Sequence, residues 1–455
     1  MAHFGMSSYS ASTIAAIATP PGTGAVALIR VSGPRAAEAV SIVFQGRDRS
    51  DWRAREQHFG KIVDEQGEVI DEVLMTFFRG PASFTGEDVV EIATHGGVVV
   101  TNRVLRRILS QGVDPALPGE FSQRAFLNGR MDLTQAEAIM DLISAQTELA
   151  AKAATEQLSG RLGDALQKIR EELISLTAHV EAYIDFPEED IDPESSDALR
   201  TRAASIGASI DQLLATADQG RILREGLRTV ICGAPNAGKS SLLNVLLGFE
   251  RAIVNEAAGT TRDTIEEVVN LNGIPIRLID TAGIRENPGA IEKEGIERSR
   301  QQMAIAELIL FVTDGSKSRE EALAVEPPEG ARMLRILNKS DLPLHPDWKG
   351  EEGIRFSCHA PDAADLIREK VFQYITEEQG MDTANLTAIN GRHQACLLRA
   401  REALNQAKAL LEQGESPEFI AMDLRQCLES IGDVIGKTDI EEILGEIFST
   451  FCIGK

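Results

Sequence analysis

The stretch Gly233–Ser241 reads GAPNAGKSS and fits the pattern G-x-x-x-x-G-K-S. It follows Leu227–Cys232 (LRTVIC), an apolar, β-branched run that predicts a buried strand, and it leads into Ser241–Leu247 (SLLNVLL), which predicts an amphipathic helix. A strand, a glycine-rich loop and a helix in this order form a phosphate-binding loop, in which backbone N–H groups and the positive end of the helix face the phosphates. We therefore expect Lys239 to reach the β- and γ-phosphates and the Ser240 hydroxyl to ligate Mg²⁺.

Two segments further along favour a nucleoside triphosphate over the alternative of a chance glycine-rich turn. Asp280–Gly283 (DTAG) ends an apolar run, and its aspartate can hold the metal through water while the Gly283 amide meets a γ-phosphate. Gly259–Asp263 (GTTRD) lies between the loop and DTAG, and Thr261 can close on Mg²⁺ when the γ-phosphate is present.

A third segment identifies the base. Asn338–Asp341 (NKSD) follows the apolar run Met333–Leu337. The Asp341 carboxylate can accept hydrogen bonds from both N–H donors on the guanine edge, which adenine lacks. Four segments in this order predict that the nucleotide is GTP, bound by a Ras-like α/β domain over residues 225–380.

Composition limits the remaining possibilities. The chain has 455 residues, enough for about three domains, and 43% of them are hydrophobic. Because the formal net charge is −24, we expect any nucleic acid to be bound through a local basic patch or a partner protein. No apolar run approaches about 18 residues, and the first residues lack the pattern of a signal peptide. The five cysteines form no C-x-x-C pair, which argues against a zinc site or a disulfide framework and favours the cytoplasm.

The first 128 residues predict an α+β domain, with strands over Ala25–Val31, Val73–Phe78 and Val89–Thr94. Arg30 and Glu91 lie inside such strands, where burying a lone charge is costly, so each is either paired or facing a ligand. Both interpretations stay open here. His95 is a candidate catalytic residue, with a hydrogen-bonded structural role as the alternative.

Residues 129–224 and 381–455 predict helices, with expected segments at Leu386–Gln413, Glu418–Ile431 and Asp439–Phe451, and an acidic loop at Pro187–Ser196. We interpret them as one helical domain divided by the inserted GTPase domain, with two separate bundles as the alternative. Thr134 and Glu137 predict a capping box before the first of these helices.

Motifs along nearly the whole chain resemble those of the tRNA-modification GTPase family MnmE, also called TrmE. These are ATPPG…ALIRVSG, FTGEDVVEIATHGG, PGEFSQRAFLNGRMDLTQAEAI, GAPNAGKSSLLN, GTTRD, DTAGIR, NKSD and the terminal CIGK. With this resemblance, the residues that we assign to GTP binding are Asn236, Ala237, Gly238, Lys239, Ser240, Ser241, Asn255, Glu256, Ala257, Ala258, Gly259, Thr260, Thr261, Asp280, Thr281, Ala282, Gly283, Asn338, Lys339, Asp341 and Ser357.

The resemblance also implies a folate-binding amino-terminal domain that forms a homodimer. The matching positions for 5-formyl- or 5,10-methylene-tetrahydrofolate are Arg30, Glu91, Arg130 and Lys455. Arg130 is lysine in the best-known relatives, and the exchange keeps the charge but changes the donor geometry. With an FAD-dependent partner, MnmG, in a heterotetramer, the family places an aminomethyl or carboxymethylaminomethyl group on carbon 5 of the wobble uridine (position 34) of certain tRNAs.

GTP hydrolysis needs a group that positions the attacking water, and this chain lacks the one that Ras-like proteins use. Ile284 stands where such a protein has the glutamine that positions water, so another group must act. Glu286 and Glu292 are both available, and the resemblance favours Glu292. It further implies that Asn236 coordinates a potassium ion between the β- and γ-phosphates, and that the remaining ligands are backbone atoms of Asn255, Ala257 and Thr260.

Cys452 lies in the apolar tail of the chain. An isolated cysteine near a chain end is usually inert packing, whereas the resemblance implies that this tail reaches the folate site, with Cys452 as a catalytic nucleophile or acid.

Three functions are compatible with these features: a GTP-hydrolysing component of a tRNA-modifying enzyme, a stand-alone regulatory GTPase, and a folate-dependent aminomethyltransferase for a small molecule. The second leaves the first 128 residues unexplained, and the third leaves the GTPase unexplained.

Overall fold

The computed structural model describes residues 12–185, 196–248, 267–279, 301–322, 331–379, 387–437 and 441–454. The chain divides into two compact units, Met1–Met140 with Gly432–Lys455, and Asp141–Ile431. The borders of the three expected domains stay a prediction.

The first unit contains a seven-stranded sheet in the order β3-β4-β5-β6-β2-β1-β7. Its strands are β1 (Ile14–Ile17), β2 (Val26–Ser32), β3 (Phe44–Gln45), β4 (Gln57–Val63), β5 (Val69–Phe78), β6 (Val89–His95) and β7 (Asp114–Pro115). Neighbours are antiparallel except β1 and β7. The three strands expected from the sequence therefore form β2, β5 and β6, with slightly different ends.

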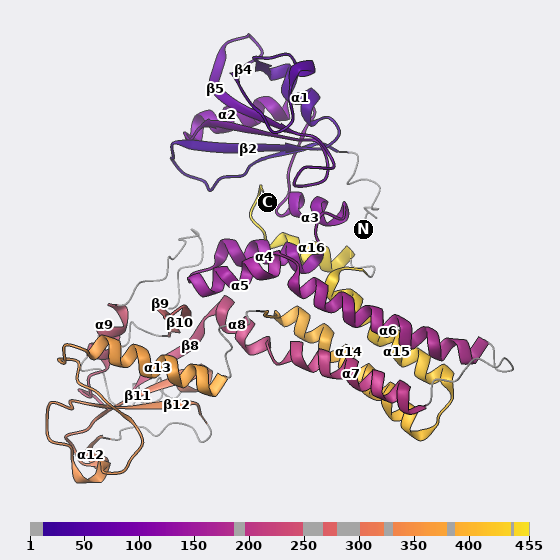
Figure 1. Cartoon of the computed structure of the whole chain (residues 1–455). Helices are drawn as coiled ribbons and strands as arrows, with labels where there is room; N and C mark the ends of the chain where they lie inside the picture. Colours follow the sequence, from indigo (N-terminus) through magenta and orange to yellow (C-terminus); the bar gives the residue numbers. More distant parts are fainter. Residues whose placement is uncertain are drawn as a thin grey trace. The chain divides into compact units, whose positions relative to one another are not determined.

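Two helices, α1 (Ala36–Val43) and α2 (Val98–Leu109), pack against this sheet (Figure 1). Alternation along the strands turns Ile29, Met75 and Ile92 toward the helices, where all three are fully buried. Another apolar cluster of this unit lies around α3 (Glu120–Leu127) and α16 (Glu441–Ser449), with Phe448 among its buried side chains.

The helical part consists of α4 (Leu133–Ser144), α5 (Glu148–Leu158), α6 (Arg161–Asp185), α7 (Ser196–Leu214), α8 (Ala217–Glu225), α14 (Gly391–Gln413) and α15 (Pro417–Ile435). In the second unit α7 contacts both α6 and α14 (Figure 1). Arg425 of α15 forms an ion pair with Glu181 of α6 at 2.7 Å. The expected helix over 386–413 begins later, at Gly391, because the Asn390 side chain caps it there. The acidic stretch 187–195 lies outside the described residues.

The prediction that Thr134 and Glu137 form the capping box is wrong. The Asp132 carboxylate accepts a hydrogen bond from the Gln135 N–H (2.9 Å), and the Gln135 side-chain oxygen accepts one from the Asp132 N–H (3.0 Å). The reciprocal pair therefore lies two residues earlier. Thr134 is buried inside α4 and donates to Asp132 at 2.6 Å.

The second sheet, in the second unit, has six strands in the order β13-β12-β11-β8-β10-β9. They are β8 (Leu227–Cys232), β9 (Glu267–Leu271), β10 (Ile274–Leu278), β11 (Leu308–Asp314), β12 (Met333–Asn338) and β13 (Ile354–Arg355), and the helices among them are α9 (Lys239–Leu247), α12 (Arg319–Ala322) and α13 (Ala363–Gln379). All neighbouring strands are parallel except β9 and β10. After β8 the chain first adds β9 and β10 on one side of β8, and later β11, β12 and β13 on the other side. The strand order therefore reverses at β8, and α/β sheets bind their ligands at the carboxyl ends of the strands at such a switch point.

Among the described residues, no helix is both long and apolar enough to cross a membrane.

Candidate nucleotide-binding and folate-binding sites

The predicted phosphate loop joins the end of β8 to the start of α9. Three of its residues have positive φ angles: Gly233 (+145°), Asn236 (+62°) and Gly238 (+104°). A Cβ on Gly233 would clash with the Val312 carbonyl oxygen of β11, and one on Gly238 would clash with the Asn338 amide. The two glycines are therefore needed for close packing as well as for backbone conformation.

Lys239 begins α9, and its ammonium group points back over the loop. Nζ donates to the carbonyl oxygens of Gly233 (3.0 Å) and Ala234 (2.9 Å). Burial lowers the pKa of Lys239 from its ordinary value. Ser240 and Ser241 are exposed residues in the first turn of the helix. These positions fit the roles expected for a phosphate loop.

The predicted guanine-binding segment lies beside this loop. Asn338 is buried, and its side-chain amide donates to the Ala237 carbonyl oxygen at 2.8 Å, which joins the two segments. Asp341 is exposed, and it accepts a hydrogen bond from the Ser357 hydroxyl at 2.7 Å. This hydrogen bond lowers the pKa of Asp341, so the carboxylate stays ionised. Ser357 thus contacts the aspartate that the sequence predicts to bind guanine, and its own role in GTP binding stays a prediction.

The other residues assigned to GTP, Mg²⁺, K⁺ and catalysis lie outside the described residues. They are Asn255, Glu256, Ala257, Ala258, Gly259, Thr260, Thr261, Asp280, Thr281, Ala282, Gly283 and Glu292. Lys455 lies outside them as well.

Arg30 and Glu91 lie directly opposite each other on β2 and β6. The Arg30 guanidinium donates two hydrogen bonds to one Glu91 oxygen, at 2.8 and 2.9 Å. The guanidinium also lies 5.0 Å from the ring centre of Phe84 and 5.6 Å from that of Phe121. The charge in this strand is therefore paired, and two aromatic rings flank it. Arg130 is exposed, and its side chain lies against Gly86, two residues beyond Phe84.

Sequence reasoning missed the buried ion pairs behind this cluster. Arg124 is only 2% exposed and pairs with Glu120 at 2.8 Å and Glu87 at 3.2 Å. Glu87 also accepts a hydrogen bond from the Ser32 hydroxyl at 2.7 Å. Glu120 and Arg124 are four residues apart, a spacing that brings side chains together on one face of a helix, and this pattern could have indicated the pair. Arg124 thus fixes α3, which carries Phe121, to the loop that carries Phe84.

The carboxyl-terminal tail docks on the same unit. The Gly119 N–H donates to the Cys452 carbonyl oxygen at 3.4 Å, and Ile453 forms a β-bridge with Pro118. Gly454 packs so closely on Ile17 that a Cβ there would clash with the Ile17 carbonyl oxygen. Cys452 is exposed and follows α16. Its backbone contacts Gly119, the residue just before α3, the helix that carries Phe121.

His95 has a buried partner. The Asp71 carboxylate, 7% exposed, accepts hydrogen bonds from the His95 backbone N–H (2.8 Å) and contacts the ring Nδ1 at 2.6 Å. The imidazole itself is 73% exposed. The structural role that the sequence left open is therefore present, and the other ring nitrogen faces outward.

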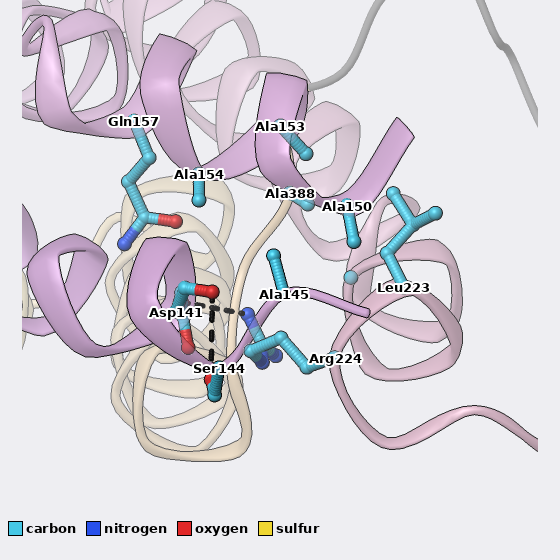
Figure 2. Close-up of a pocket in the computed structure, with 11 residues that line it drawn as sticks. Asp141, Ser144, Ala145, Ala150, Ala153, Ala154, Gln157, Leu223, Arg224 and Ala388 are labelled. Carbon is cyan, nitrogen blue, oxygen red and sulfur yellow. Dashed lines mark hydrogen bonds and ion pairs between the residues drawn. The ribbon is translucent and has the colours of Figure 1, made fainter. Parts of the chain in front are cut away.

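A small cavity lies where α4, α5 and α8 meet the segment before α14 (Figure 2). Alanine side chains line much of it, and Arg224 reaches across toward Asp141 at 3.8 Å. Arg224 also donates to the Ile389 carbonyl oxygen at 2.9 Å. A Cβ on Gly220 would clash with the same carbonyl. The chain segments that lead into and out of the nucleotide-binding sheet are thus fastened side by side.

A phosphate loop at the switch point of a mostly parallel sheet, next to an N-K-x-D segment, defines a P-loop GTPase, here combined with an α+β unit and long helices. Residues 133–452 match the family described as "MnmE helical domain", and residues 13–130 match "GTP-binding protein TrmE N-terminus". The chain belongs to the tRNA modification GTPase MnmE family.

Individual relatives agree with this assignment. The tRNA modification GTPase MnmE of Akkermansia muciniphila is 48% identical over 97% of this chain and 99% of its own length. That of Natranaerobius thermophilus is 42% identical over 97% and 99%, respectively. The solved G domain of the T. maritima FeoB iron transporter is 21% identical, covering 32% of this chain and 98% of that one, with a TM-score of 0.22.

Proposed function

We propose that this chain hydrolyses GTP as part of the enzyme that modifies the wobble uridine (position 34) of tRNA. In this proposal an aminomethyl or carboxymethylaminomethyl group is added at carbon 5, and tetrahydrofolate supplies the carbon. The observation that carries the proposal is the phosphate loop tied to an N-K-x-D turn through the Asn338–Ala237 hydrogen bond, in a chain that also has the Arg30 cluster.

The nucleotide site fits GTP with its ions. The Lys239 ammonium group can move from the loop carbonyls to the β- and γ-phosphates, which offer it stronger, charged acceptors. Ser240 lies in the first turn of α9 next to Lys239, where a hydroxyl oxygen suits Mg²⁺, together with Thr261. Asn236 is exposed at a positive φ, so its amide oxygen is free to ligate K⁺ with the backbone of Asn255, Ala257 and Thr260. Bound K⁺ would neutralise charge between the β- and γ-phosphates, and Glu292 would act on the attacking water.

The Arg30 cluster fits a folate. Phe84 and Phe121 offer flat apolar faces, and the Glu91 carboxylate can accept N–H donors of a pterin ring. Arg30 and exposed Arg130 supply positive charge for the carboxylates of the ligand, with Lys455. We further propose that the chain works as a homodimer, in a heterotetramer with an FAD-dependent MnmG partner, in the cytoplasm.

The test is nucleoside analysis of tRNA from a strain that lacks the gene. We expect the modified wobble uridines to be lost, and to return when the wild-type gene is supplied but not when a Lys239→Ala variant is supplied. Unchanged nucleosides in the deletion strain would contradict the proposal and favour a stand-alone regulatory GTPase or an aminomethyltransferase for a small molecule.

A further inference from the structure

Asp314, the last residue of β11, is a buried carboxylate with hydrogen bonds to both oxygens. Oδ2 accepts from the Lys339 ammonium group at 2.7 Å, and Oδ1 accepts from the Ser316 hydroxyl (2.6 Å) and backbone N–H (3.1 Å). The side chain is 6% exposed. Burial alone would raise the pKa of Asp314, but the hydrogen bonds from Lys339 and Ser316 bring it below its ordinary value. The carboxylate is therefore ionised at neutral pH.

Lys339 is held in an unusual conformation. Its φ angle is +62°, a left-handed backbone that residues other than glycine rarely adopt and keep only where their surroundings fix it. Asp314 holds the side chain, while the Gly315 N–H donates to the Asn338 carbonyl oxygen at 3.0 Å. The Leu342 N–H closes the turn on the Lys339 carbonyl oxygen at 2.9 Å. The turn over residues 338–342 is thus anchored from the neighbouring strand.

This turn carries the proposed contacts to the nucleotide on both sides of Lys339. Asn338 contacts the phosphate loop at Ala237, and Asp341 lies beside Ser357. The backbone of Asp314 lies opposite Asn338 in the parallel pair β11–β12, whereas its carboxylate, among the described residues, hydrogen-bonds to Lys339 and Ser316. We therefore expect the carboxylate to influence the base through Lys339.

We propose that Asp314 is a positioning residue for guanine recognition, which holds Lys339 and with it the turn over residues 338–342 in the arrangement that accepts the base. The inference rests on the proposed GTP binding and deepens it. An ion pair that served the fold alone would change stability and leave base affinity unchanged.

The test compares Asp314→Asn with the wild type in the full-length chain, with a fluorescent GDP analogue as the probe. We expect the Kd to rise about tenfold or more, because a hydrogen bond to a charged group is lost. The KM for GTP should rise by a similar factor, and kcat should change less. Glu351→Gln is the matched control, because Glu351 pairs with Arg319 (2.7 Å) and Arg335 (3.2 Å) in the same domain but away from the turn. It should leave the Kd unchanged.

A double-mutant cycle with Lys339→Met tests whether Asp314 acts through Lys339. The combined loss of GDP affinity should be clearly smaller than the sum of the two single losses. Additive losses, or a folded Asp314→Asn protein that binds GDP within about twofold of the wild type, would overturn the inference. If Asp314→Asn does not fold, Ser316→Ala replaces it, with an expected loss of about threefold, and an unchanged Kd would again overturn the inference. A wild-type chain that does not bind GDP would overturn the proposed function as well.

Discussion

The backbone N–H of Gly119 donates a hydrogen bond to the carbonyl oxygen of Cys452 at 3.4 Å, and this contact joins the start of α3 to the tail of the chain. The backbone at Gly119 also lies close to the end of α16. A Cβ on Gly119 would lie 2.6 Å from the Phe448 carbonyl oxygen, so the tail can reach its position only when residue 119 has no side chain.

The variant Gly119→Ala should therefore displace the tail and lower tRNA modification strongly, while GTP hydrolysis changes little. Gly129→Ala is the matched control, because both glycines have φ +67° but a Cβ on Gly129 would meet nothing within 4 Å. In both variants an alanine in the left-handed backbone conformation lowers the stability of the fold by about 1 kcal/mol, and only Gly119→Ala adds a steric clash. Tail release can be measured as carboxypeptidase cleavage of the folded protein. Equal cleavage of the two variants would contradict the prediction.

Thiol reactivity should separate exposed Cys452 from the buried residues Cys232 and Cys427. Burial raises the pKa of Cys232 and of Cys427 to about 12, so only about one thiol in 10⁴ is ionised at pH 8. Because the thiolate is the reactive form, these two residues should stay inert until the pH approaches 12 or the chain unfolds. Titration with a chromogenic disulfide at pH 8 should give a fast phase from exposed Cys452. A fast phase that persists in Cys452→Ser would contradict this assignment.

Potassium should stimulate GTP hydrolysis well above sodium, and Asn236→Ala should lose most of that difference, because the variant removes the proposed amide ligand. Asn272→Ala is the matched control, since Asn272 also has a positive φ (+50°) but lies in the turn between β9 and β10. It should keep the response to potassium. Steady-state phosphate release in the two salts measures the effect, and equal wild-type rates would refute a potassium site.

Arg224→Met should destabilise the second unit by about 1–3 kcal/mol, because the Ile389 carbonyl oxygen and the Asp141 carboxylate each lose a partner. Arg161→Met removes an exposed ion pair with Glu156 and should change stability by less than about 1 kcal/mol. Urea denaturation followed by circular dichroism measures both. Similar shifts in the two variants would show that the Arg224 contacts contribute little.

The sequence predicted the elements that local patterns specify. The strand predicted at Leu227–Cys232 is confirmed as β8, and the run Met333–Leu337 lies in β12. Local chemistry can also mislead. Thr134 and Glu137 have the spacing of a capping box, but Asp132 and Gln135 form it, because two overlapping patterns compete and the buried Thr134 side chain belongs to the core.

Contacts between distant residues could not be predicted in this way. Asp71 and His95 meet because β5 and β6 are neighbours in one register, and nothing within either strand specifies that pairing. Asp314 lies beside the turn over residues 338–342 because β11 and β12 end at the same level. The sequence identified Arg30 and Glu91 as charges in need of partners, but only the register of β2 and β6 shows that they are partners of each other.

The fastening of Gly220 and Arg224 to Ile389 has a consequence for how such a chain can be rebuilt. Since the polypeptide leaves the helices and returns to them at adjoining points, the nucleotide-binding module can be cut out and the gap closed with a short link. A foreign module whose own ends lie close together can be grafted in its place.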